Sequence, residues 1–107
     1  MPSITNDAPT VELELSLEEQ WVLHHVLTDY IDVASGEGAD LPKPVVEIAL
    51  AEKIEAGTFA FTAFELDKLL FRCRFHARND AVPDADRTVA QALADRIDSV
   101  NGQPILR

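Results

Sequence analysis

The sequence contains two similar halves, and this internal repeat constrains the fold more than any other feature. The seven residues LAEKIEA that begin at Leu50 recur in type as LADRIDS beginning at Leu93, 43 positions later. The segment LSLEE at 15–19 has the same layout as FTAFE at 61–65, 46 positions later. A longer loop around Gly36 and Gly38 in the first half accounts for the difference between the two offsets. A repeat of this length is typical of one supersecondary unit that is copied and packed on itself.

Local signals predict the elements of the first half. Residues 11–15 alternate between apolar and acidic types, which is typical of a half-buried strand. Ser16 and Glu19 form a Ser-x-x-Glu capping box, which predicts a helix that runs to about Ala34. Pro44 suits the first turn of a second helix, and Gly57 is expected to end it.

The second half repeats this order. Residues 58–61 are expected to form a short strand, and Thr62 and Glu65 form a second capping box that begins a helix to about residue 78. After a loop over 79–84, a fourth helix is expected to end at Gly102. Residues 103–106 could add a terminal strand, which Pro104 restricts to a sheet edge.

These elements predict a mainly α-helical fold. We expect a four-helix pseudo-twofold bundle built from a duplicated strand–helix–helix unit, with the two short β-strands side by side. We predict a flexible N-terminus over 1–9 and a single domain over 10–107, divided into repeat one (10–57), repeat two (58–102) and a C-terminal edge segment (103–107). At 107 residues the chain has the length of one domain.

The net charge of −10 lies in the first half of the chain. Residues 1–56 contain twelve acidic residues against Lys43 and Lys53, whereas residues 57–107 contain equal numbers of acids and bases. Excess surface acid keeps a protein soluble in concentrated salt, and its self-repulsion destabilises the fold in dilute buffer. The composition therefore predicts a halophilic source; the alternative is an acidic face that docks a basic partner or imitates nucleic acid.

Compartment and membrane association are also predicted from the residues. A basic segment followed by an apolar leader is absent from the start of the chain, and no apolar stretch is long enough to span a bilayer. The single Cys73 excludes an internal disulfide and suits a reducing interior. We therefore expect a cytoplasmic protein.

Three phenylalanines on the third predicted helix form the main candidate binding surface. They are Phe64, Phe71 and Phe75, and at 100° per residue they lie within about 40° of one another. Lys68 and Arg78 border them, and an aromatic surface edged by bases is typical of a protein interface. A self-complementary patch of this kind favours a homodimer, although another protein's helix could also bind there. The alternative is that the third helix is central and buries both of its apolar stripes.

Residue patterns that would support catalysis are weak. His25 and Asp29 have the i, i+4 spacing of two metal ligands, but the sequence does not place a third ligand such as His76 beside them. We therefore predict no metal site. Phosphate-binding loops and activated nucleophiles are absent from the sequence, and Cys73 is expected in the core. We predict a non-enzymatic protein without a cofactor or small-molecule substrate. Trp21 is expected at the boundary of the core, half-buried; the alternative is that it extends a contact surface.

Residues 13–27, LELSLEEQWVLHHVL, resemble a family of small uncharacterised proteins of haloarchaea, whose helices begin with a similar run of residues. The resemblance is strongest over 11–31 and is only general afterwards, at the pattern FTAFEL over 61–66. It agrees with the acidic composition. The family has no assigned activity, so the resemblance implies no functional residue.

Two classes of function remain open from the sequence. The first is a protein-interaction module, and the alternative is a nucleic-acid-associated transcriptional regulator. A strand followed by two helices is similar to the ribbon-helix-helix layout, whose paired strands enter the major groove. The outward strand residues here are expected to be Glu12 and Glu14, which would repel phosphate. The run Lys68, Arg72, Arg74 and Arg78 is the candidate basic footprint.

Overall fold

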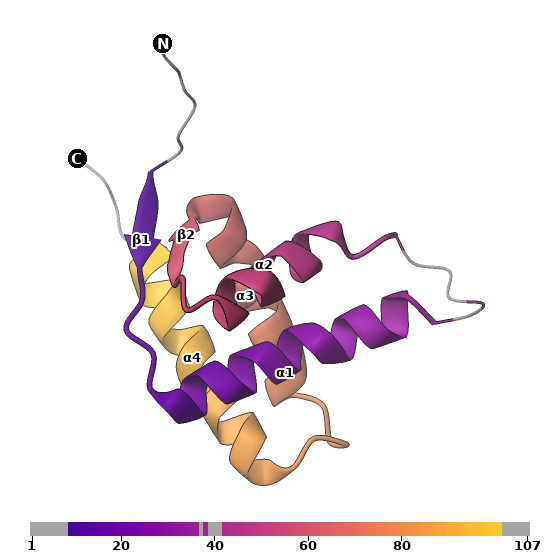
Figure 1. Cartoon of the computed structure of the whole chain (residues 1–107). Helices are drawn as coiled ribbons and strands as arrows, with labels where there is room; N and C mark the ends of the chain where they lie inside the picture. Colours follow the sequence, from indigo (N-terminus) through magenta and orange to yellow (C-terminus); the bar gives the residue numbers. More distant parts are fainter. Residues whose placement is uncertain (1–8, 37, 39–41, 102–107) are drawn as a thin grey trace.

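The computed structural model describes residues 9–36, 38 and 42–101, and it is mainly helical (Figure 1). The elements follow the predicted order: β1 (Thr10–Glu12), α1 (Leu17–Ala34), α2 (Val45–Glu55), β2 (Ala60–Thr62), α3 (Ala63–Ala77) and α4 (Asp84–Asn101). The two strands pair antiparallel, with Val11 opposite Phe61. The prediction that two short strands lie side by side is confirmed.

Both predicted capping boxes begin a helix. At α1 the amide of Glu19 donates to Ser16 Oγ over 3.1 Å, and the amide of Ser16 donates to Glu19 Oε1 over 2.9 Å. Thr62 and Glu65 make the same two bonds at the start of α3, over 3.2 and 2.9 Å. Each box satisfies amides that the first helical turn leaves without a partner, so both helices begin where the sequence predicts.

The strands are shifted and shorter than predicted. β1 ends at Glu12, although the next amide, that of Leu13, still donates to the carbonyl of Phe59 over 3.0 Å. β2 begins at Ala60, two residues later than expected. α2 ends as predicted beside Gly57, whose φ of +76° lies in the left-handed region that glycine adopts without a Cβ clash. The predicted helix end at Gly102, residues 1–8 of the flexible N-terminus predicted over 1–9, and the edge segment 103–107 lie outside the described residues.

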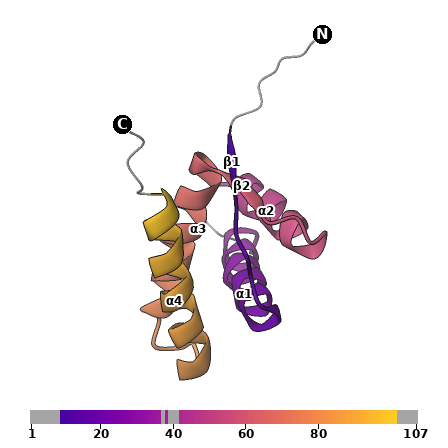
Figure 2. The same cartoon turned by 90° about the vertical axis from the view of Figure 1, so that its left-hand side faces the viewer.

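The hydrophobic core lies between two helix pairs. Figure 2 shows α1 and α2 toward one side and α3 and α4 toward the other, with the strands between them. The largest fully buried side chains come from every helix and from β2: Leu23, Leu27, Leu50, Phe61, Leu66, Leu69, Leu93 and Ile97. Within the described residues, no helix is long and apolar enough to cross a membrane.

Two ionic contacts link the halves in a reciprocal manner. Lys53 of α2 donates to Glu65 Oε1 over 2.9 Å and to the carbonyl of Ala60 over 2.8 Å. Arg96 of α4 donates to the carboxylate of Glu19 and, over 2.6 Å, to the carbonyl of Glu14. Burial acts to raise the pKa of both glutamates, but the cap amides and the neighbouring cations outweigh it and lower each pKa. Each capping-box glutamate therefore stabilises both its own helix and the contact with the other half.

A buried acidic residue joins α2 to α3. Glu47 is only 3% exposed, and its Oε2 accepts from Arg72 Nε over 3.2 Å and lies 3.8 Å from Lys68 Nζ. The Arg72 guanidinium also stacks on the ring of Tyr30 in α1, 3.4 Å from its centroid. One carboxylate and one guanidinium thus connect three helices, because a charge taken out of water requires partners of opposite charge.

Candidate functional site

α3 buries only one of its two apolar stripes. Leu66, Leu69 and Cys73 lie in the core, whereas Phe64, Phe71 and Phe75 are 60%, 58% and 63% exposed. We call Phe64, Lys68, Phe71, Phe75 and Arg78 the aromatic face. The alternative in which α3 buries both stripes is wrong, because all three rings are more than half exposed. Large exposed aromatics on one helix face are typical of a contact surface.

Basic residues border the aromatic face, but most of them already have carboxylate partners. Lys68 lies beside Glu47, and Arg74 Nη2 is 3.3 Å from Asp98 Oδ2 of α4. Arg78 is exposed at the C-terminal end of α3. A hollow of about 790 Å³ lies along this end of the helix, lined by Phe71, Arg74, Phe75, Arg78, Asn79 and Asp80. The face therefore combines exposed rings, a hollow beside them and a basic border.

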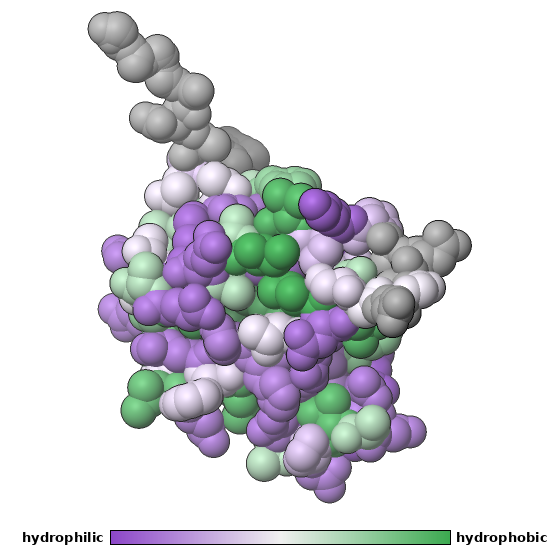
Figure 3. Space-filling model, turned by 45° about the vertical axis from the view of Figure 1, so that its right-hand side comes forward, coloured by the Kyte–Doolittle hydropathy of each residue, from purple (hydrophilic) through white to green (hydrophobic). Residues whose placement is uncertain are grey.

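Other apolar side chains are exposed away from α3. Figure 3 shows one face of the molecule, on which hydrophobic side chains lie among hydrophilic ones. Trp21 of α1 is 69% exposed, so the prediction that it is half-buried is wrong, and the alternative of a surface position remains. Its neighbours Val22 and Leu23 point into the core and leave Trp21 at the surface. Cys73 lies in the core as predicted, and burial raises the pKa of its thiol to about 12, which suppresses the reactive thiolate.

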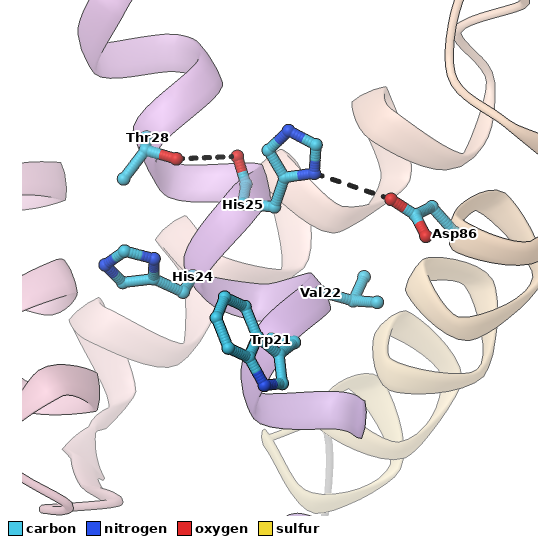
Figure 4. Close-up of a pocket in the computed structure, with 6 residues that line it drawn as sticks. All are labelled: Trp21, Val22, His24, His25, Thr28 and Asp86. Atoms are coloured by element: carbon cyan, nitrogen blue, oxygen red, sulfur yellow. Dashed lines mark hydrogen bonds and ion pairs between the residues drawn. The ribbon is translucent and has the colours of Figure 1, made fainter. Parts of the chain in front are cut away.

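A second candidate site is formed where α1, α3 and α4 approach one another. His25 Nε2 lies 3.3 Å from Asp29 Oδ1, and His76 Nδ1 lies 3.8 Å from Asp29 Oδ2. The other ring nitrogen of His25, Nδ1, lies 3.4 Å from Asp86 Oδ2 of α4, as Figure 4 shows. We call His25, Asp29, His76 and Asp86 the histidine cluster. The sequence suggested His25 and Asp29 as a pair on α1 and named His76 as a possible third ligand. Only the packing of α3 on α1 places His76 beside that pair.

His76 is the unusual member of this cluster. Its side chain is 5% exposed, and within the described residues its Nε2 atom is buried without a hydrogen-bond partner. Burial lowers the pKa of His76, against the opposing effect of the Asp29 carboxylate, so the neutral imidazole is favoured near pH 7. A buried polar atom without a partner costs about 1–3 kcal/mol. A buried polar group without a partner is rare in native proteins and calls for an explanation.

Comparison with known proteins gives one match. A family described as DUF7853, a family of unknown function, matches residues 13–98. The chain belongs to the DUF7853 family. The matched range begins at the buried Leu13 and ends within α4, so it spans α1, α2, β2 and α3 as well as most of α4. No curated protein and no solved structure matches the chain at a significant level.

The DUF7853 match confirms the resemblance to an uncharacterised family and assigns no role to any residue. Both candidate sites, the aromatic face and the histidine cluster, lie within its boundaries. Their chemistry must therefore be argued from the contacts of this chain.

Proposed function

We propose that this protein is a non-enzymatic interaction module that forms a homodimer through the aromatic face of α3. The single observation that carries the proposal is the exposure of Phe64, Phe71 and Phe75 on one side of a helix whose other side is in the core. Rings of this size are costly to leave in water, and a twofold homodimer is the most common arrangement that covers such a surface.

The order of residues on the aromatic face is self-complementary. If two copies of α3 pack antiparallel about a twofold axis between positions 69 and 70, Phe64 lies opposite Phe75 of the second copy. The same axis places Phe71 opposite Lys68 of the second copy. Phe64 and Phe75 are about 16 Å apart along the helix, so the two aromatic pairs would flank a central pair of cation–π contacts. A second copy therefore fits the face better than an unrelated helix.

Charge also favours this face over the rest of the surface as a contact between two acidic chains. The first half carries the whole net charge of −10, whereas the aromatic face lies in the half with equal numbers of acids and bases. Lys68 and Arg78 reduce the negative potential there. Contact through α3, whose half of the sequence has balanced charge, therefore involves less repulsion between the copies than contact through α1 or α2 would.

The charges on the strands and the ion pairs of the basic residues argue against binding to nucleic acid. Neither strand contains a basic residue, and Glu12 is exposed on β1. Of the four bases in the predicted footprint, Lys68, Arg72 and Arg74 have a carboxylate within 4 Å. Phosphate binding would have to displace these carboxylates, so we rank a transcriptional regulator below an interaction module.

We also infer that the two halves derive from one duplicated unit. The reciprocal contacts support this, because Glu65 and Ala60 follow Glu19 and Glu14 by 46 positions and Arg96 follows Lys53 by 43. Leu13 and Phe59, also 46 positions apart, meet through a backbone hydrogen bond as residues beside a local twofold axis would. In this relation the phenylalanines of the aromatic face correspond to Glu18, His25 and Asp29, which are exposed on α1. The equivalent positions are therefore polar on α1 and aromatic on α3. This difference favours a protein contact that involves α3 and not α1.

Substitution of Phe71 by aspartate is expected to convert the homodimer into a folded monomer. The change places a charge at the centre of the proposed contact, next to the twofold axis, without touching the core. The molar mass measured by light scattering after gel filtration in concentrated KCl should fall from two chains to one. The circular dichroism spectrum should stay that of the parent chain, because Phe71 is 58% exposed.

Trp21→Asp is the matched control, since Trp21 is an equally exposed aromatic on a different helix. This variant should remain dimeric. The proposal is wrong if the parent chain is a monomer, or if Phe71→Asp and Trp21→Asp give the same mass. A mixture of Lys68→Cys and Phe71→Cys chains should also be joined by a short bismaleimide, whereas another register of the two helices would separate these positions.

We further propose that the acidic first half reflects a cytoplasm of high salt concentration. The fold should loosen in dilute buffer and recover when KCl is added, because at about 1 M salt the Debye length is only ~3 Å and repulsion between carboxylates is screened. The midpoint of thermal unfolding, followed by circular dichroism, should rise with KCl. A midpoint of thermal unfolding that does not change between dilute buffer and about 2 M KCl would contradict a halophilic source.

A further inference from the structure

We propose that the histidine cluster binds one divalent transition-metal ion of the zinc class, with His25, Asp29 and His76 as ligands. The proposal does not rest on the homodimer, because none of the three ligands belongs to the aromatic face, although Phe75 of that face lines a hollow shared with Asp29 and His76. Two imidazoles and one carboxylate form a donor set that suits Zn²⁺ and its first-row neighbours.

The separations between the donor atoms fit such an ion. In a tetrahedral site with bonds of about 2.0–2.1 Å, neighbouring ligand atoms lie about 3.3 Å apart. The separation between His25 Nε2 and Asp29 Oδ1 is already 3.3 Å, and that between Asp29 Oδ2 and His76 Nδ1 is 3.8 Å. One ligand atom from each of the three residues lies within 4.8 Å of the others, so small rotations of exposed side chains would complete the set.

The contacts around the cluster also fit metal binding. A histidine that ligates a metal through one ring nitrogen commonly donates the proton on the other to a carboxylate, which fixes the tautomer. Asp86 lies 3.4 Å from Nδ1 of His25 and is placed to accept this proton (Figure 4). Nε2 of the same ring lies 3.3 Å from Asp29 Oδ1, so one ion could contact both atoms. His76 Nδ1, 3.8 Å from Asp29 Oδ2, offers a third donor atom from α3.

An ion can reach the cluster from either side of α1. A hollow of about 400 Å³ between α1 and α4 is lined by Trp21, His25, Thr28 and Asp86, among others. A second hollow, of about 540 Å³, lies between α1 and α3 and includes Asp29 and His76 in its lining. The acidic first half attracts cations to both openings. A bound ion would join α1 and α3 directly, and Asp86 of α4 would contact it only through His25.

Titration of the purified chain, with any affinity tag removed, against Zn²⁺ alone tests the proposal. The buffer should contain concentrated KCl and excess Mg²⁺, so that exposed carboxylates are already occupied. We expect one Zn²⁺ per chain by calorimetry and a higher midpoint of thermal unfolding. Co²⁺ in place of Zn²⁺ should give the intense visible absorption of a tetrahedral site and quench the fluorescence of Trp21, the single tryptophan, which lines the same hollow as His25.

His24→Ala is the matched control for His25→Ala, because His24 is the adjacent residue and its Nε2 contacts Glu55 outside the cluster. His24→Ala should bind like the parent chain. Asp86→Asn should weaken binding about 10–100-fold, the usual effect of losing a carboxylate behind a metal-ligating histidine, and His25→Ala and Asp29→Asn should weaken it at least as much. Equal affinities for His24→Ala and His25→Ala, or no saturable Zn²⁺ binding by the parent chain, would overturn the proposal. If a variant fails to fold, the Co²⁺ spectrum of the parent chain decides: absence of the tetrahedral bands overturns it.

Discussion

Replacement of Glu47 by alanine is expected to lower the free energy of unfolding by about 3–5 kcal/mol. The substitution leaves the Arg72 guanidinium between α1, α2 and α3 without its carboxylate, and the Arg72 side chain is only 13% exposed, so water replaces that partner poorly. Lys68 loses less, since its side chain is 36% exposed and can turn outward. A domain of this size has about 5–15 kcal/mol of stability, so the variant should be partly unfolded at physiological temperature. Urea denaturation followed by circular dichroism measures the loss.

Two further variants identify the cause of that loss. Glu52→Ala makes the same change on the exposed side of α2 and should alter the free energy of unfolding by no more than about 0.5 kcal/mol. Glu47→Gln keeps the shape and an acceptor oxygen but removes the charge, so its loss should be intermediate. Equal losses for Glu47→Ala and Glu52→Ala would mean that Arg72 finds other partners or water, and that the buried ion pair contributes little.

The starts of α1 and α3 could be predicted from the sequence because a capping box is a local structure. Ser16 with Glu19, and Thr62 with Glu65, lie three residues apart and satisfy their own backbone amides. The end of α2 at Gly57 is equally local. The strands were predicted less well, because a strand is defined by its partner. The alternating pattern over 11–15 placed Leu13 in the core correctly, but Val11, expected on the same side, is 38% exposed. The sequence also does not contain the register that ends β1 at Glu12.

The candidate sites divide in the same way. Helical periodicity placed the aromatic face on one side of α3, but only the packing of the other helices decides that this side is exposed. The histidine cluster depends on how α3 crosses α1, which no local pattern encodes, so His76 could be named but not placed. The i, i+4 pair His25 and Asp29 was the available signal. Asp86 gave no signal, because a single aspartate in the first turn of a helix is ordinary.

Replacement of Phe61 by alanine is expected to lower the free energy of unfolding by about 3–5 kcal/mol. Phe61 is fully buried in β2, opposite Val11, and it is the largest of the fully buried side chains. Its ring also lies 5.3 Å from Lys53 Nζ, so the cavity would remove the aromatic neighbour of a cation that connects the two halves. The loss should appear as a lower urea midpoint with an unchanged slope, since the surface exposed on unfolding changes little.

Phe64→Ala is the control for Phe61→Ala, because it makes the same substitution three residues later at an exposed position. The comparison shows whether burial, and not the loss of a phenylalanine as such, causes the destabilisation. Phe64 is 60% exposed, so the same change should cost no more than about 0.5 kcal/mol in a dilute sample where the copies are apart. At higher concentration Phe64→Ala should instead weaken the homodimer, because Phe64 faces Phe75 of the second copy in the proposed register. Equal and large losses at both positions in dilute solution would contradict the fold, since they would require the aromatic face to be part of the core. A small loss for Phe61→Ala would also contradict the fold, because it would mean that the β1–β2 sheet contributes little to the contact between the halves.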